Sequence, residues 1–220
     1  MTVLLGLSAV VTANAAQGDA EAGKGKTAMC AACHGAEGNS AVPNFPKLAG
    51  QGKKYLLKQL NDIKSGKRAV IEMTGILDAF SEQDLENLAA YFSSQTGTSG
   101  QAKKELVNAG EVLYRSGNAA TQVAACTACH GRSGKGVELA AFPALSGQHA
   151  DYIASQLKKF RTGERSNDGD TRMMRSVAAR LSDKEIEAVA SYYLGFNKYA
   201  AAKRAIEKYL LTHKLFYKLS

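Results

Sequence analysis

The chain has 220 residues, 45% of them hydrophobic, and carries a formal net charge of +8 at neutral pH. Five of the eight excess positive charges lie in residues 197–220, so the rest of the chain is nearly neutral. A nucleic-acid-binding protein is expected to carry its basic residues on the folded body, and this distribution argues against that class. The length is sufficient for two compact domains of roughly 100 residues each.

The N-terminal segment has the composition of a secretory signal peptide. An apolar run over residues 3–11 is followed by Ala13-Asn14-Ala15, a small-x-small pattern typical of a cleavage site, although no Lys or Arg precedes the run. The run is too short for a membrane-spanning helix, which needs roughly 20 apolar residues. We therefore expect residues 1–16 to be a signal peptide and the protein to be exported to the periplasm.

The chain repeats one unit twice. All four cysteines lie in "CAACHG" at residues 30–35 and "CTACHG" at residues 126–131. After each motif, "FPKLAGQ" or "FPALSGQ" precedes a segment whose apolar residues have helical spacing. A solenoid needs at least about three such units, so two copies indicate a tandem pair of domains.

Two further helices are expected in each copy. Segments 19–29 and 103–117 are predicted to be helices that enter the motifs, and segments 81–92 and 182–193 to be helices that close the domains. The closing helices begin with the spacing of a capping box, Ser81 with Asp84 and Ser182 with Glu185.

These patterns predict an all-α fold, because no segment alternates between apolar and polar residues as a strand does. We expect the first domain over residues 17–98 and the second over residues 99–196, joined near the Ser-, Thr- and Gly-rich segment 93–101. A C-terminal extension, residues 197–220, follows them.

The residue after each Cys-x-x-Cys pair indicates its chemistry. A redox dithiol is normally found in an α/β domain, and a zinc ribbon places its two pairs about 15–20 residues apart, so neither fits well. Cys-x-x-Cys-His is the attachment motif of c-type haem, in which both thiols bind the porphyrin covalently and the histidine binds the iron. We therefore predict two haems, one on Cys30 and Cys33 and one on Cys126 and Cys129, with zinc as the weaker alternative.

The histidine ligands are then His34 and His130, and the opposite face of each iron needs a second ligand. Methionine is the leading candidate, because few histidines lie outside the motifs. In the first copy Met73 lies eight residues before Ser81, and in the second copy Met174 lies eight residues before Ser182. This shared phase favours Met174 over Met173, and Met29 directly precedes Cys30, a position from which it is not expected to reach the opposite face of the haem. Met73 and Met174 are therefore the predicted ligands, although core filling is a common role of methionine.

Three other pairs or single residues lie near these motifs. Pro46 and Pro143 occupy equivalent positions, where a preceding carbonyl or the ring itself is expected to orient the histidine ligand. His149 is expected at the surface near a haem. Tyr55 and Tyr152 are candidates for contact with a haem propionate or for core packing.

The sequence resembles the dihaem cytochrome c4 family. The resemblance covers roughly residues 18–196 and rests on the two motifs, on "NFPKLAGQ" with "FPALSGQH", on "IEMTGIL" and on "NDGDTRMMRSVAARLS". It implies two class I cytochrome c domains with His/Met-ligated haems, in a periplasmic carrier that is not an enzyme. The implied partners are a quinol-oxidising complex upstream and a haem-copper terminal oxidase downstream.

Two alternative functions are compatible with these motifs, and the C-terminal segment departs from the family pattern. A dihaem peroxidase-like enzyme would require one iron without its sixth ligand, whereas a cytochrome subunit of a larger respiratory complex would need the same haems. The family usually ends near Phe196, but here a basic amphipathic segment follows. Such a helix can lie on an anionic membrane or dock on a partner, or it can pack on the second domain.

Overall fold

The computed structural model describes residues 18–196 and Tyr209. The predicted signal peptide and, apart from Tyr209, the C-terminal extension lie outside the described residues. Within the described part, no helix combines the length and the apolar character that crossing a membrane requires.

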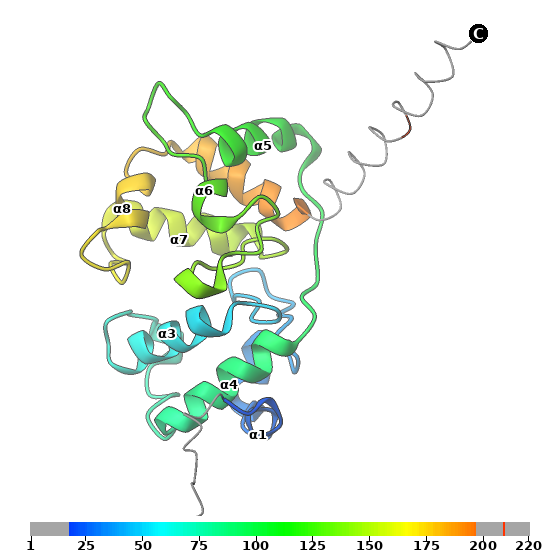
Figure 1. Ribbon diagram of the computed structural model, residues 1–220, viewed down its shortest axis with the longest axis vertical. Coiled ribbons are helices and arrows are strands. Elements are labelled where there is room, and N and C mark those ends of the chain that lie inside the picture. Colours follow the sequence, from blue (N-terminus) through cyan, green and yellow to red (C-terminus); the bar gives the residue numbers. More distant parts are fainter. Residues whose placement is uncertain (1–17, 197–208, 210–220) are drawn as a thin grey trace, which may run out of the picture.

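The described chain folds into two helical domains stacked along the long axis of the molecule (Figure 1). The first domain contains α1 (Ala20–Lys24), α2 (Ala28–His34), α3 (Lys53–Lys64), the 3₁₀ turn η1 (Ile71–Met73) and α4 (Glu82–Ser94). The second contains η2 (Lys104–Leu106), α5 (Val107–Ser116), α6 (Thr127–His130), η3 (Glu138–Ala140), α7 (Ala150–Thr162), α8 (Met173–Ala178) and a helix over residues 183–196.

The all-α prediction is confirmed. Among the described residues, extended pairing is limited to two isolated bridges, Asn118 with Val123 and Val137 with Phe142. One predicted helix is wrong in its extent: the segment 19–29 is divided into α1 and the start of α2. Gly25 caps α1 and Thr27 precedes α2, so the chain turns between them before the first motif.

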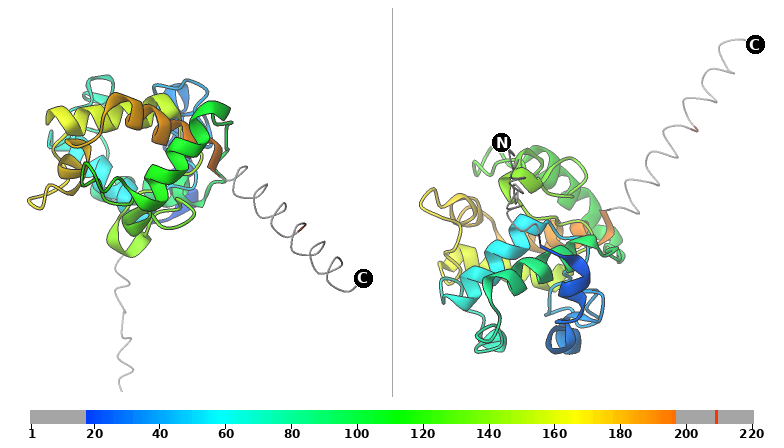
Figure 2. Two further views of the ribbon diagram at one scale, coloured as in Figure 1. Left: turned by 90° about the horizontal axis from the view of Figure 1, so that it is seen from above. Right: turned by 60° about the horizontal axis from the view of Figure 1, so that its bottom comes forward.

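In each domain the entering helix crosses the closing helix (Figure 2), and a glycine lies where the two helices touch. A Cβ atom added to Gly23 of α1 would lie 2.1 Å from the Asn87 carbonyl oxygen of α4. A Cβ added to Gly110 of α5 would lie 2.4 Å from the Ala188 carbonyl oxygen. The absence of a side chain therefore allows the two backbones of each pair to touch.

The closing helices begin as their sequences predict. In α4 the Ser81 hydroxyl accepts a hydrogen bond from the Asp84 amide, and the Asp84 carboxylate accepts one from the Ser81 amide. Ser182 and Glu185 make the same reciprocal pair at the start of the last helix. These bonds satisfy amide groups that have no partner inside the helix.

Each domain has its own apolar core, built on the inner face of its closing helix. The first core contains the predicted residues Leu85, Leu88, Ala89 and Phe92, and the second contains Ile186, Val189, Ala190 and Tyr193. All eight are buried, which confirms the helical spacing read from the sequence. Both cores stop at a large cavity between the motif helices and the helices α3 and α7.

Candidate functional site

The two Cys-x-x-Cys-His motifs lie on short helices that present the reactive side chains on one side. In α2, Cys33 and His34 are three and four residues after Cys30, a spacing that places all three on one helix face. In the second copy Cys126 is the N-cap of α6, which ends at His130.

The glycine that completes each motif ends the helix. Gly35 has a φ of 77° and Gly131 a φ of 75°, a region that side-chain-bearing residues rarely adopt. A Cβ on Gly35 would also lie 2.7 Å from the Asn39 carbonyl oxygen. The chain therefore turns sharply after each histidine.

Both motifs border one cavity of about 900 Å³. Its lining is mostly apolar and comes from both domains. All eight predicted site residues border it: Cys30, Cys33, His34, Met73, Cys126, Cys129, His130 and Met174. Large, mostly apolar cavities with a few convergent polar groups are typical of cofactor sites.

The methionines of the chain differ in their surroundings. Met73 and Met174 are half-buried and pack against the cores of the first and second domain respectively. Met29 and Met173 also border the cavity, but they are 54% and 46% exposed. The structure thus gives the two methionines chosen by repeat phase a similar environment, different from that of the other two.

Both histidines are held by a proline carbonyl. His34 Nδ1 lies 2.8 Å from the Pro46 oxygen, and His130 Nδ1 lies 3.0 Å from the Pro143 oxygen. Since a carbonyl only accepts, Nδ1 carries the hydrogen and Nε2 is left as the ligand atom. The orienting role expected of the prolines is therefore present, but it belongs to each proline's own carbonyl rather than to the ring or the preceding carbonyl.

Burial controls the charge of these groups. It lowers the pKa of His34 and His130 below the ordinary value of 6.5, which favours the neutral imidazole that binds iron. Burial also raises the pKa of the Cys30 and Cys126 thiols. A redox-active cysteine needs a lowered pKa, so this environment does not favour a catalytic dithiol.

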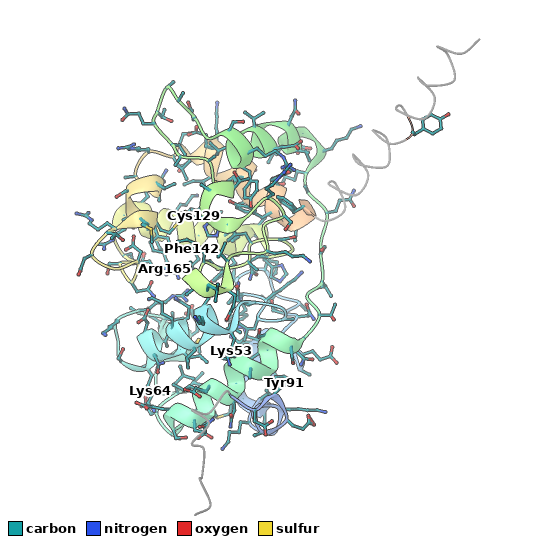
Figure 3. All side chains as sticks on the ribbon, in the orientation of Figure 1. Lys53, Lys64, Tyr91, Cys129, Phe142 and Arg165 are labelled. Carbon is teal, nitrogen blue, oxygen red and sulfur yellow. The ribbon has the colours of Figure 1, made fainter. Side chains whose placement is uncertain are left out.

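Two buried arginines border the same cavity, and sequence reasoning missed them. Arg68 is 9% exposed and Arg165 is 7% exposed (Arg165 is labelled in Figure 3). Among the described residues, neither guanidinium forms an ion pair with a carboxylate, and each bonds to tyrosine and glutamine side chains of both domains. They follow a glycine in equivalent positions, "GKR" and "GER", and this repetition was the available signal.

These arginines provide a test of whether the site fits haem. A buried guanidinium without a carboxylate partner favours an anionic ligand. The propionates of haem are such groups, so Arg68 and Arg165 would hold them, while the cysteines and histidines hold the porphyrin and the iron. The donor set, the apolar lining and the paired cations all suit that cofactor.

One surface prediction is wrong. His149 is not a free surface residue but a contact between the domains, where its Nε2 lies 2.9 Å from the Ser40 carbonyl oxygen. Tyr55 and Tyr152 also lie at the boundary between the domains, each accepting a hydrogen bond from an arginine of the other domain. Sequence comparison within the chain could not place them there, because it does not show which faces of the copies meet.

The comparisons with known proteins agree with this geometry. The cytochrome c family model matches residues 20–96 and again residues 114–195. Cytochrome c4 of Azotobacter vinelandii is 57% identical over 206 residues, which cover 90% of this chain and 98% of that protein. The structure of reduced recombinant cytochrome c4 from Pseudomonas stutzeri has a TM-score of 0.80 and 58% identity, covering 81% of this chain and 99% of that one.

A more distant relative is named for a different role. The thiosulfate dehydrogenase electron acceptor of Stutzerimonas stutzeri is 37% identical over 168 residues, covering 74% of this chain and 77% of that protein. Two family matches, each containing one Cys-x-x-Cys-His motif, imply one covalent c-type haem per domain. The chain therefore belongs to the cytochrome c4 family, as a two-domain electron-transfer cytochrome with two covalently bound c-type haems.

Proposed function

We propose that the protein is a periplasmic one-electron carrier in which His34 and Met73 ligate the first haem iron, and His130 and Met174 the second. The observation that carries this proposal is repeated in both domains. A buried histidine with its Nδ1 fixed by a proline carbonyl and a half-buried methionine border the same cavity.

Such ligation suits electron transfer rather than substrate chemistry. If one histidine and one methionine hold each iron, no position is left for a substrate, so the bound haem would supply one-electron transfer, and the methionine ligand would raise its potential. The chain contributes neutral imidazoles, thioether sulfurs and an apolar lining that limits access of water. Arg68 and Arg165 supply positive charge where the cofactor's carboxylates would lie.

The physiological partners in this proposal are other redox proteins. We infer a quinol-oxidising complex as donor and a haem-copper terminal oxidase as acceptor, as the resemblance to the family implies. The relative named as a thiosulfate dehydrogenase electron acceptor supports the partner class, a redox protein, rather than these two identities. Reduction of the purified protein by a quinol-oxidising complex, and its oxidation by a terminal oxidase, would test the two directions separately.

The ligand assignment is tested by substituting each methionine. We expect Met73→Ala and Met174→Ala each to remove about half of the far-red methionine–iron absorption band of the oxidised protein, because each removes one of two sulfur ligands. Met173→Ala is the matched control, since it neighbours Met174 but is half exposed, and it should keep the whole band.

Two results would contradict the proposal. Loss of the band in Met173→Ala instead of Met174→Ala would reassign the second ligand. A high-spin haem in the native oxidised protein that reacts rapidly with peroxide would favour the peroxidase-like alternative, because it would show an open position on one iron.

A further inference from the structure

Two buried glutamines connect the domains in a reciprocal way. Gln51 and Gln148 end the equivalent "FPKLAGQ" and "FPALSGQ" segments, and each is 7% exposed. Their side chains form hydrogen bonds within the loop of their own domain and also with the other domain. Each amide reaches the backbone of the other domain, at the residue that follows the histidine-binding proline.

The contacts match in both directions. Gln148 Oε1 accepts from the Lys47 amide at 2.9 Å, and its Nε2 donates to the Lys47 carbonyl at 2.8 Å. Gln51 Oε1 accepts from the Ala144 amide at 2.7 Å, and its Nε2 donates to the Ala144 carbonyl at 2.9 Å. Each side-chain amide therefore pairs with both polar groups of one backbone residue.

The amide that each glutamine holds is part of the peptide group that holds a histidine. The Pro46 carbonyl accepts from His34 Nδ1, and the amide on the other end of that peptide, Lys47 N–H, donates to Gln148. In the second domain the Pro143 carbonyl accepts from His130, and the Ala144 amide donates to Gln51. One peptide group thus separates each histidine from a glutamine of the opposite domain.

A peptide group that donates through its N–H becomes a better acceptor at its carbonyl, because hydrogen bonds in a chain polarise one another. A stronger acceptor at Nδ1–H makes the imidazole a more basic ligand, which stabilises the oxidised iron. The glutamine therefore acts on the far histidine through a fixed dipole, with no contact to the ligand itself.

We propose that Gln51 and Gln148 are crossed positioning residues: Gln148 of the second domain sets the potential of the haem in the first domain, and Gln51 sets that of the second. This inference rests on the proposed ligation by His34 and His130. It makes each domain's redox property dependent on correct docking of the other domain.

The test is a redox titration of the full holoprotein in which the two haems are distinguished by their assigned haem-methyl NMR resonances. In Gln148→Leu we expect the first-domain haem to become easier to reduce by threefold to tenfold in its equilibrium constant, or about 28–59 mV. The second-domain haem should shift much less. Gln51→Leu should give the opposite pattern, and exchange of the His34 or His130 ring N–H with solvent should accelerate only on the affected side.

A residue that only holds the domains together would behave differently. His149→Ala is the matched control, because it removes a hydrogen bond between the domains, to Ser40, without touching either proline peptide. It should move neither potential selectively. If Gln148→Leu shifts both haems equally, or shifts the haem of its own domain, the crossed coupling is wrong.

Folding and ligation are checked separately. If Gln148→Leu does not take up haem, Gln148→Glu replaces it in the titration, because it keeps an acceptor for the Lys47 amide. The added negative charge should lower the potential of the first haem more than that of the second. Equal shifts of the two potentials would contradict the proposal. His34→Ala should abolish the low-spin spectrum of the first haem if histidine is the ligand. Suppose that both leucine variants keep the low-spin spectrum of the wild type and that neither haem potential changes. That result would contradict the crossed coupling by the glutamines but not the proposed ligation by the histidines.

Discussion

At the scale of single residues, the same contact is kept although the loops around it differ in length. Proline follows histidine after 12 residues in the first copy and after 13 in the second, yet the Nδ1–oxygen distances are 2.8 and 3.0 Å. The longer loop of the second copy contains a turn closed by the Val137–Phe142 bridge, in which Ala141 adopts a φ of 54°. The histidine is therefore fixed by its hydrogen bond and not by the length of the loop.

A second residue-scale constraint is the missing side chain at the helix crossings. We expect Gly23→Ala to lower the free energy of unfolding by about 1–3 kcal/mol, because its Cβ would overlap the backbone of α4, which cannot rotate away. Gly25→Ala is the control: the nearest atom to its Cβ is 3.6 Å away, and it should change stability by less than about 0.5 kcal/mol. Chemical denaturation followed by circular dichroism measures both, and equal effects would show that the crossing is not tightly packed.

Residue patterns single out the proposed haem-binding residues better than the residues that support them. The cysteines and histidines follow from the spacing of the attachment motif, and the methionines are proposed from the phase of the repeat. Arg68, Arg165 and the two glutamines have no such local rule. Their partners lie in the other domain, roughly a hundred residues away along the chain, so only their equivalence between the copies indicated a shared role.

At the scale of secondary-structure elements, the long helices follow from apolar periodicity and capping. α3, α4, α7 and the closing helix of the second domain all occur where the spacing predicts them. The short elements do not have enough turns for a period to be detected, which is why the break between α1 and α2 and the helix α8 were not foreseen. The N-cap of α8 is Arg172, which has a φ of 51° and follows a loop that is longer than the corresponding loop of the first copy.

The capping box of α4 makes a prediction about pH. A hydrogen bond from Lys26, followed by those from the Ser81 amide and hydroxyl, lowers the pKa of the Asp84 carboxylate to about 2 from its ordinary 3.8. Because the folded pKa lies below the unfolded one, this stabilisation is complete above about pH 4 and is lost as the pH falls through about 2. We expect Asp84→Asn to be less stable than the wild type at neutral pH and to converge with it in acid.

Denaturation curves at neutral and acidic pH measure that convergence. Asp78→Asn, which removes an exposed carboxylate outside the capping box, is the control for loss of one negative charge and should change stability less. A difference between Asp84→Asn and wild type that stays constant down to pH values near 2 would show that the charge of Asp84 does not stabilise the helix.

At the scale of the whole molecule, the domains meet through polar groups rather than through a shared apolar core. Each core contains residues of its own domain alone, and the contacts between the domains include reciprocal hydrogen bonds from glutamines and arginines. Interfaces between domains are often small and permit relative motion. Here the glutamine and arginine bonds across the boundary are at least partly buried, so separating the domains breaks several buried or partly buried hydrogen bonds at once.

This interface predicts that the two domains unfold together. Arg165 of the second domain bonds to Tyr55 and Gln59 of the first, with distances of 3.1 and 3.0 Å. Removing it in Arg165→Met leaves the Tyr55 hydroxyl without that donor, at a cost of about 1–3 kcal/mol for a group that stays buried, whereas Gln59 keeps Arg68 and Asn167 as donors. Scanning calorimetry of the holoprotein should therefore show one transition for the wild type and two for the variant, because the domains lose their coupling before either core melts.

Arg161→Met is the matched control, since Arg161 bonds only to Leu181 and Asp183 of its own domain among the described residues, and it should keep the single transition. Two separate transitions already present in the wild type would mean that the crossed hydrogen bonds do not join the domains into one cooperative unit.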